Sequence, residues 1–119
     1  MGRHSTKDAE RLDLMQGTLD MLILKTLRIG PLHGQAIART IEQTTKDLLK
    51  VDHGSLYPAL QRLQQEGWIE AEWGVSTNNR KAKFYTLTRA GRRQLHAEQS
   101  RWQQLTSAIA LIMNPSGQE

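Results

Sequence analysis

Cysteine is absent from the 119 residues, which excludes disulfides, thiolate catalysis and cysteine-ligated zinc. No apolar run approaches the roughly 18 residues of a membrane-spanning helix, and the first ten residues are too polar for a signal peptide. Aromatic residues are also few: one Phe, two Tyr and three Trp. An RNA-binding surface that stacks bases on exposed rings is therefore disfavoured. We expect a cytoplasmic protein with no membrane partner.

Acidic residues are missing from the stretch between Glu72 and Glu98. The same stretch holds a block of basic residues: Arg80, Lys81, Lys83, Arg89, Arg92 and Arg93. The whole chain carries a net charge of only +4, so the local excess is more informative than the total. A segregated basic block predicts a phosphate-binding surface, and a solvated basic face is the alternative.

Motifs typical of enzymes and metal sites are missing as well. The chain has no glycine-rich phosphate loop and no HExxH spacing. Its histidines lie in separate segments, and none is paired with a nucleophile motif: His4, His33, His53 and His96. We therefore expect no catalytic residue, no cofactor and no metal ion.

Apolar residues at helical spacing predict three short helices in the first half of the chain. The first covers 18–28, with Thr18 as its N-cap. The second covers 34–44. The third covers 54–66, with Gly67 at the position just beyond a helix end where glycine is common.

Pro58 allows two registers for the third helix. With Ser55 as the N-cap, Pro58 falls in the first turn, where its missing N–H costs little. With Asp52 as the N-cap, it falls in the second turn, which it should distort. The sequence leaves both registers open.

A period of two residues replaces the helical period after Gly67. Residues 68–74 alternate, and residues 83–87 are rich in β-formers, so we predict a two-stranded hairpin with a long loop at 75–82. Thr88 is a good N-cap for a last helix at 89–113, roughly 37 Å long at ~1.5 Å per residue. This helix carries its own apolar stripe, which we expect to form a dimer interface: Leu95, Trp102, Leu105, Ile109 and Ile112.

The predicted order is ααα-ββ-α, a mainly α (α+β) winged helix-turn-helix fold with a long C-terminal dimerisation helix. We divide the chain into a flexible segment at 1–16, a DNA-binding domain at 17–87, the dimerisation helix at 88–113 and a flexible tail at 114–119. A long helix with an apolar stripe finds little to pack against in one small domain, so a second copy of the chain is the expected partner.

In a helix-turn-helix the second helix of the pair enters the major groove of double-stranded DNA. The polar start of helix 54–66 would then face DNA, with the hydroxyls of Ser55 and Tyr57 on phosphates and Gln61 on adenine. Arg62 would meet guanine or the backbone, although Tyr57 as half-buried support and Arg62 as a solvated side chain are the alternatives. The loop of the hairpin would reach the backbone or the minor groove through Asn78, Asn79, Arg80, Lys81 and Lys83.

Four segments together resemble the PadR family of transcriptional regulators. They are GTLDMLILKTL at 17–27, PLHGQAIA at 31–38, GSLYPALQRLQQEGWI at 54–69 and RKAKFYTLTRAGRRQL at 80–95. The resemblance implies a homodimeric winged-helix protein, usually a repressor, that binds a palindromic operator through helix 54–66 and a basic wing at 75–83. The single C-terminal helix is similar to that of the smaller of the family's two size classes.

The resemblance also implies roles for single residues. Ser55, Tyr57 and Arg62 match recognition-helix positions, and Arg80, Lys81 and Lys83 match the basic wing. Trp102 falls where some members place an aromatic residue beside which small aromatic ligands stack and release the DNA. A tryptophan on an apolar stripe is more typical of a dimer core, so both interpretations of Trp102 stand.

A protein-interaction adaptor without DNA binding is the alternative function. Such an adaptor would present an apolar or acidic face on helix 54–66. The face here is polar to basic, which favours DNA.

Overall fold

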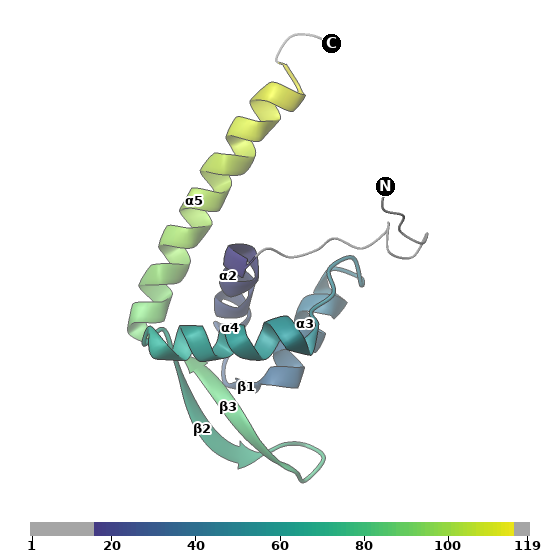
Figure 1. Cartoon of the computed structure of the whole chain (residues 1–119), viewed down its shortest axis with the longest axis vertical. Helices are drawn as coiled ribbons and strands as arrows, with labels where there is room; N and C mark the ends of the chain where they lie inside the picture. Colours follow the sequence, from purple (N-terminus) through teal and green to yellow (C-terminus); the bar gives the residue numbers. More distant parts are fainter. Residues whose placement is uncertain (1–15, 116–119) are drawn as a thin grey trace.

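The computed structural model describes residues 16–115. The predicted flexible segment at 1–16 and the tail at 114–119 lie almost wholly outside these residues. Within them the elements are α2 (Gln16–Thr26), β1 (Leu32–His33), α3 (Gly34–Thr44), α4 (His53–Gln65), β2 (Ile69–Val75), β3 (Lys81–Leu87) and α5 (Arg89–Met113). The three strands form one antiparallel sheet in the order β1-β3-β2, and the predicted α+β fold is confirmed (Figure 1).

The core lies where α2, α3 and α4 meet the base of the sheet. Helix α2 is apolar on several sides and packs against α3, α4 and α5. Its side chains join those of the other elements in one cluster that includes Ile23, Ile37, Leu60 and Ile69, each no more than 1 % exposed. The burial of such side chains is the main force that stabilises a domain of this size.

Helix α2 is shifted along the chain from its predicted position. It already includes Gln16 and ends at Thr26, so Thr18 lies inside the helix and its prediction as the N-cap is wrong. The tighter turns after Thr26, such as the bond of 3.2 Å from the N–H of Gly30 to the carbonyl of Leu27, end the helix earlier than expected.

Helix α4 uses the second of the two registers that Pro58 allowed. Asp52 is the N-cap, and its carboxylate accepts the N–H of Ser55 at 2.8 Å. Pro58 therefore lies in the second turn of a helix that runs unbroken to Gln65. Proline cannot donate to the carbonyl four residues earlier, which is that of Gly54. Because Gly54 is exposed, water can take the place of the missing bond.

The hairpin is longer and its loop shorter than the sequence suggested. Val75 pairs with Lys81, which leaves only residues 76–80 in the loop. The N–H of Ser76 donates to the carbonyl of Arg80 at 2.8 Å, and Asn79 takes a left-handed conformation with φ of 60°. Strand β1 was not predicted, because two residues carry no detectable periodicity. It pairs Leu32 with Tyr85 and His33 with Phe84.

Helix α5 begins where predicted. The Thr88 hydroxyl oxygen accepts the N–H of Gly91 at 3.0 Å, and the same hydroxyl donates to the carbonyl of Gly67 at 2.7 Å. Leu95 is only 4 % exposed and belongs to the core of its own chain, so its prediction as a dimer-interface residue is wrong. Leu95 belongs to the apolar stripe of α5, but the N-terminal part of α5 packs on α2. This end of the stripe is therefore buried within the chain itself.

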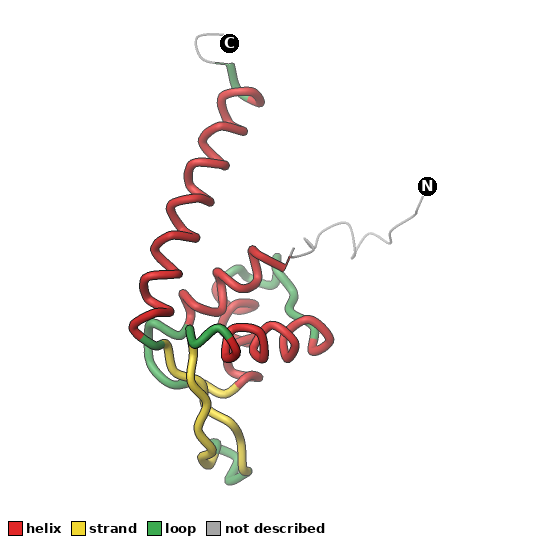
Figure 2. The backbone as a smooth tube through the Cα atoms, turned by 60° about the vertical axis from the view of Figure 1, so that its left-hand side comes forward, coloured by secondary structure: helices red, strands yellow, loops and turns green. Residues whose placement is uncertain are grey.

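From Arg101 onward almost all side chains of α5 are exposed, because this part of the helix has left the body of the protein. It projects to one side, while the hairpin projects to the opposite side (Figures 1 and 2). Over residues 16–115, no helix has the length and apolar character to span a membrane.

Candidate functional site

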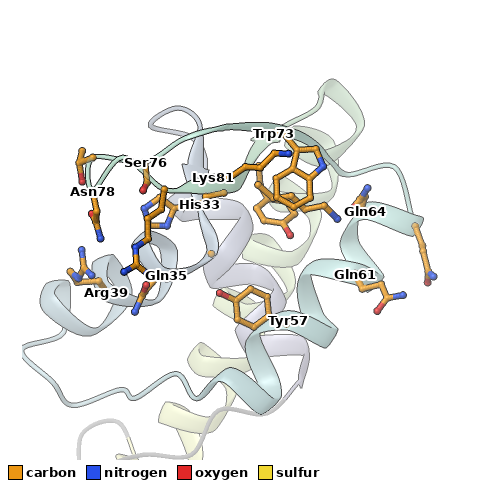
Figure 3. A pocket seen from close by; sticks show the side chains of 17 residues that line it. His33, Gln35, Arg39, Tyr57, Gln61, Gln64, Trp73, Ser76, Asn78 and Lys81 are labelled. Atoms are coloured by element: carbon orange, nitrogen blue, oxygen red, sulfur yellow. The ribbon is translucent and has the colours of Figure 1, made fainter.

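A groove of about 1030 Å³ separates the helical body from the hairpin. One wall consists of exposed side chains of α3 and α4, and the other of side chains of β2, β3 and their loop (Figure 3). Many of the lining side chains carry a charge or can form hydrogen bonds, among them Gln35, Arg39, Tyr57, Gln61, Gln64, Trp73, Ser76, Asn78, Arg80, Lys81 and Lys83.

The wall formed by α4 is the polar face of an amphipathic helix. Tyr57, Gln61 and Gln64 recur every three or four residues and line the groove. The opposite face is buried in the core through Leu56 and Leu60, among others. The sequence therefore turns one side of α4 inward and presents the other to whatever enters the groove.

Tyr57 is held in place from two sides. A Cβ atom built on Gly34 would lie 2.9 Å from its Cε1 atom, so the ring rests directly on a glycine. His53 meets the same ring edge to face, with 5.7 Å between the centroids. The side chain is nevertheless 45 % exposed, which leaves it accessible to a ligand.

The wall formed by the hairpin is aromatic and basic. Trp73 lies directly opposite Lys83 in the strand register. The Nζ atoms of Lys81 and Lys83 lie 5.4 Å and 5.8 Å from the centre of its ring, which is within reach of a cation–π interaction. The loop adds Asn78 and Arg80 to the same side.

His33 lies between the two walls. Its Nδ1 atom accepts the N–H of Ala36 at 3.2 Å and caps α3. Its ring packs edge to face on Phe84, with 5.5 Å between the centroids. Because Nδ1 accepts this bond, the neutral ring carries its proton on Nε2.

The groove collects most of the residues predicted to contact DNA. Tyr57, Gln61, Asn78, Arg80, Lys81 and Lys83 line it, and Ser55, Arg62 and Asn79 do not. Ser55 lies exposed in the first turn of α4, beside the Asp52 cap. Asn79 supplies the left-handed residue of the loop.

Arg62 takes part in an ion pair within the protein. Its Nη2 atom lies 2.8 Å from Oδ1 of Asp20, so it connects α4 to α2. The Asp20 side chain is 17 % exposed. Burial raises the pKa of Asp20, the hydrogen bond and charge of Arg62 oppose that rise, and the charge of Glu98 on α5 adds to it.

The basic block between Glu72 and Glu98 is divided by the fold. Arg80, Lys81 and Lys83 belong to the groove. The remainder, Arg89, Arg92 and Arg93, are exposed on the first turns of α5 and do not line it.

Several groove residues were not predicted from the sequence, among them His33, Arg39 and Trp73. The two-residue alternation groups Trp73 with Ile69, which is buried, so the pattern alone suggests a core position. Arg39 and His33 lie on or before α3, whose role in the groove becomes visible only when the hairpin is placed opposite it.

The groove suits a polyanion. Among the described residues that line it are four cations, Arg39, Arg80, Lys81 and Lys83, and no Asp or Glu. Positive charge together with amide and hydroxyl donors is typical of a surface that binds the phosphate backbone of a nucleic acid. Across residues 16–115, no three His, Cys, Asp or Glu side chains gather in a way that could hold a metal ion.

A second surface lies on the projecting part of α5. Its apolar side chains are between 46 % and 79 % exposed: Trp102, Leu105, Ile109, Leu111, Ile112 and Met113. Leu111 and Met113 were not in the predicted interface. Trp102, Leu105, Ile109 and Ile112 recur every three or four residues and form one apolar face of the helix, while Leu111 lies on the other side. An exposed apolar face of this kind is typical of an interaction surface.

Comparison with known proteins agrees with this geometry. The model of the Transcriptional regulator PadR-like family matches residues 23–97. The Negative transcriptional regulator PadR of Bacillus subtilis (strain 168) is 32 % identical over 78 residues, which are 66 % of this chain and 43 % of that protein. The chain thus spans less than half the length of that relative.

Solved structures share the fold. A PadR family transcriptional regulator from Eggerthella lenta has a TM-score of 0.72 at 27 % identity, over 85 % of this chain and 86 % of that one. A Streptococcus mutans protein has a TM-score of 0.78 at 21 % identity, over 91 % and 97 %. Since the family model matches more than half of its residues, the chain belongs to the PadR-like family and is a DNA-binding transcriptional regulator, not an enzyme.

Proposed function

We propose that the chain is a homodimeric repressor that binds a palindromic operator with α4 in the major groove and the hairpin against the backbone beside it. The observation that carries the proposal is the groove between them, which is lined by four cations and by no carboxylate of the described residues. A DNA strand supplies the matching charge along its whole length.

In this docking the exposed face of α4 meets base edges. Gln61 can donate to and accept from adenine at the same time, and the Tyr57 hydroxyl suits a phosphate. Ser55 lies in the first turn of α4, where helix N–H groups attract phosphate. Arg62 is bound to Asp20, and we assign it the task of holding α4 rather than reading a base.

The hairpin follows the sugar–phosphate ridge that separates the major from the minor groove. Arg80, Lys81 and Lys83 would neutralise phosphates, and Asn78 and Asn79 at the loop would reach the minor groove. Contacts of this kind position a protein without reading much sequence.

Two copies of the chain would associate through the apolar face of α5. The two α4 helices then meet successive major grooves, with half-site centres about 10 bp apart. Repression is supported by the Bacillus subtilis relative, whose name describes a negative regulator. Since that relative is bacterial, we keep the cytoplasm as the place of action.

Release of DNA would follow a change in the angle between the two α5 helices. A ligand can drive this change only if it prefers one dimer geometry over the other. Trp102, 46 % exposed in the single chain, belongs to the proposed dimer face. An aromatic effector beside it stays a prediction.

Fluorescence anisotropy tests the proposal. The first duplex carries the DNA just upstream of the gene that encodes the chain, and the second carries the same bases in scrambled order. We expect tighter, salt-sensitive binding to the first between about 50 mM and 200 mM salt. No binding to either duplex at low salt would contradict the proposal and favour the adaptor.

The Arg80→Ala variant tests the place of the hairpin in this docking. Loss of one phosphate contact should weaken binding to both duplexes and lower the slope of log K against log salt by about 0.9. Arg93→Ala is the matched control, because it removes the same charge from an exposed site outside the groove. Equal slopes for the two variants would remove the hairpin from the interface.

A further inference from the structure

Trp73 is unusually exposed for a tryptophan. It is 61 % exposed, compared with 46 % for Trp102, while Trp68 is half-buried against the core. Trp102 lies on a face that a second chain can cover. Trp73 lies instead on the wall of the groove, opposite Tyr57 and Gln61 (Figure 3).

The strand explains how a core-facing position becomes a groove position. Ile69, Ala71 and Trp73 alternate onto one face of β2. Ile69 is buried in the core and Ala71 packs against it. The hairpin then extends past the helices (Figure 2), so the same face carries Trp73 beyond the core and along the groove.

Two lysines are organised around the indole ring. The Nζ atoms of Lys81 and Lys83 lie 5.4 Å and 5.8 Å from its centre. The ring therefore concentrates two ammonium groups on one stretch of the wall and restricts their motion before any ligand arrives. Side chains that are ordered in advance lose less entropy on binding.

The chemistry of this cluster fits one kind of ligand. The indole Nε1–H group can only donate a hydrogen bond, and ammonium groups have no acceptor either. Phosphate oxygens can only accept. The face of the indole ring is apolar and can pack on a sugar, so ring and lysines together match the alternation of sugar and phosphate along a nucleic-acid strand.

We propose that Trp73, together with Lys81 and Lys83, forms a backbone clamp in which the indole ring packs on a deoxyribose and the two ammonium groups bind the phosphates around it. The clamp rests on the proposed DNA-binding function and assigns Trp73 a role in it. It recognises the backbone and not the base, so it contributes equally to operator and non-operator DNA.

Fluorine NMR of the full chain tests the clamp directly. Incorporation of 5-fluorotryptophan gives one resonance for each of the three tryptophans, and the resonance missing from Trp73→Phe identifies Trp73. On addition of a mixed-sequence duplex at low salt, we expect this resonance to shift and its solvent isotope effect to fall, because the ring becomes covered.

Anisotropy of the same samples separates the two possible failures. If the labelled duplex binds and the Trp73 resonance keeps its position and solvent exposure, the clamp is wrong and the proposed function stands. If the duplex does not bind at all, both the proposed function and the clamp are wrong. A purely structural role for Trp73 also predicts an unchanged resonance.

Affinity measurements provide the second test. Trp73→Ala should weaken binding to operator and scrambled duplexes alike, by about fivefold to tenfold. Thr86→Ala is the matched control, because Thr86 is exposed on the same hairpin, alternates onto the face of β3 opposite to Lys81 and Lys83, and does not line the groove. It should change affinity by less than twofold. An equal effect of both variants, or a loss confined to the operator, would overturn the clamp.

Discussion

At the scale of single residues, Asp20 interacts with charges on two neighbouring helices. It lies on α2 and forms an ion pair with Arg62 on α4 at 2.8 Å. The negative charge of Glu98 on α5 adds to the rise in the pKa of Asp20. Glu98 is itself held by a hydrogen bond of 2.7 Å from Gln94. Since α2 packs against both α4 and α5, Asp20 lies on the helix that joins α4 to α5.

The titration of Asp20 should be visible in the stability of the protein. Burial raises its pKa above the ordinary value of 3.8, so the folded state holds the proton more tightly than the unfolded state. Its contribution to the free energy of unfolding is then largest at low pH and falls as the pH rises through the raised pKa.

Asp20→Asn removes this titration. We expect the free energy of unfolding of the wild type, relative to the variant, to decrease as the pH rises from about 4 towards neutrality. Urea unfolding at one protein concentration measures it. A difference that increases instead would mean that the ion pair with Arg62 outweighs the burial of Asp20.

The packing partners of single side chains were the feature that the sequence predicted least well. It assigned Leu95 to the dimer and did not reveal the ion pair of Arg62, because helical spacing does not say which partner a side chain packs against. The partner of Arg62 is 42 residues away in sequence, and Leu95 is covered by its own chain. Trp73 was overlooked for a related reason: alternation indicates a face of a strand, not how far the core extends along it.

At the scale of elements, α5 is attached to the body by a very close approach. A Cβ atom on Gly91 would lie 2.0 Å from the carbonyl oxygen of Trp68 and 2.8 Å from Cδ1 of Leu87. This backbone oxygen accepts the N–H of Thr88 at 3.0 Å and cannot move aside easily. The first turn of α5 therefore needs glycine where it crosses the start of β2.

Gly91→Ala should lower the free energy of unfolding by about 1–3 kcal/mol, the usual cost of overpacking. Thermal and urea unfolding measure the loss. Gly17→Ala is the control, since nothing lies within 4 Å of the added Cβ on α2. That change should be neutral or stabilising by up to about 1 kcal/mol. A neutral Gly91→Ala would contradict the close packing of α5 on the sheet.

Elements with strong local signals were the ones that the sequence predicted well. Helices α3 and α5 begin and end as expected, because the apolar period of each is clear, and in α5 the cap residue Thr88 and the later Pro115 mark the two ends. The first helix was displaced where its start had only one cap candidate. Strand β1 and the extra hairpin pairs depend on partners distant in the chain, and no local pattern reports them.

At the scale of the whole molecule, two surfaces of opposite character lie at opposite ends. The basic groove lies between the helical body and the hairpin, and the apolar face of α5 projects the other way (Figure 1). Within residues 16–115 no element covers that face, and a single α4 can read only one half of a palindrome. Both facts favour the proposed dimer, in which α5 sets the spacing of the two grooves.

Leu105→Glu tests this arrangement. Leu105 is 57 % exposed in the middle of the apolar face, and a carboxylate buried against a second copy would lose its hydration at high cost. We expect sedimentation velocity to report monomers. Ser107→Glu adds the same charge to the opposite side of α5, where Ser107 is also exposed, and should leave the dimer intact.

The same pair of variants connects assembly to DNA binding. A monomer cannot bind both half-sites at once, so Leu105→Glu should weaken operator binding by about 10²-fold or more. The difference in affinity between the operator and the scrambled duplex should become smaller. Ser107→Glu should keep wild-type affinity. A Leu105→Glu protein that still sediments as a dimer would move the interface away from α5, and a monomer with full operator affinity would refute the two-half-site docking.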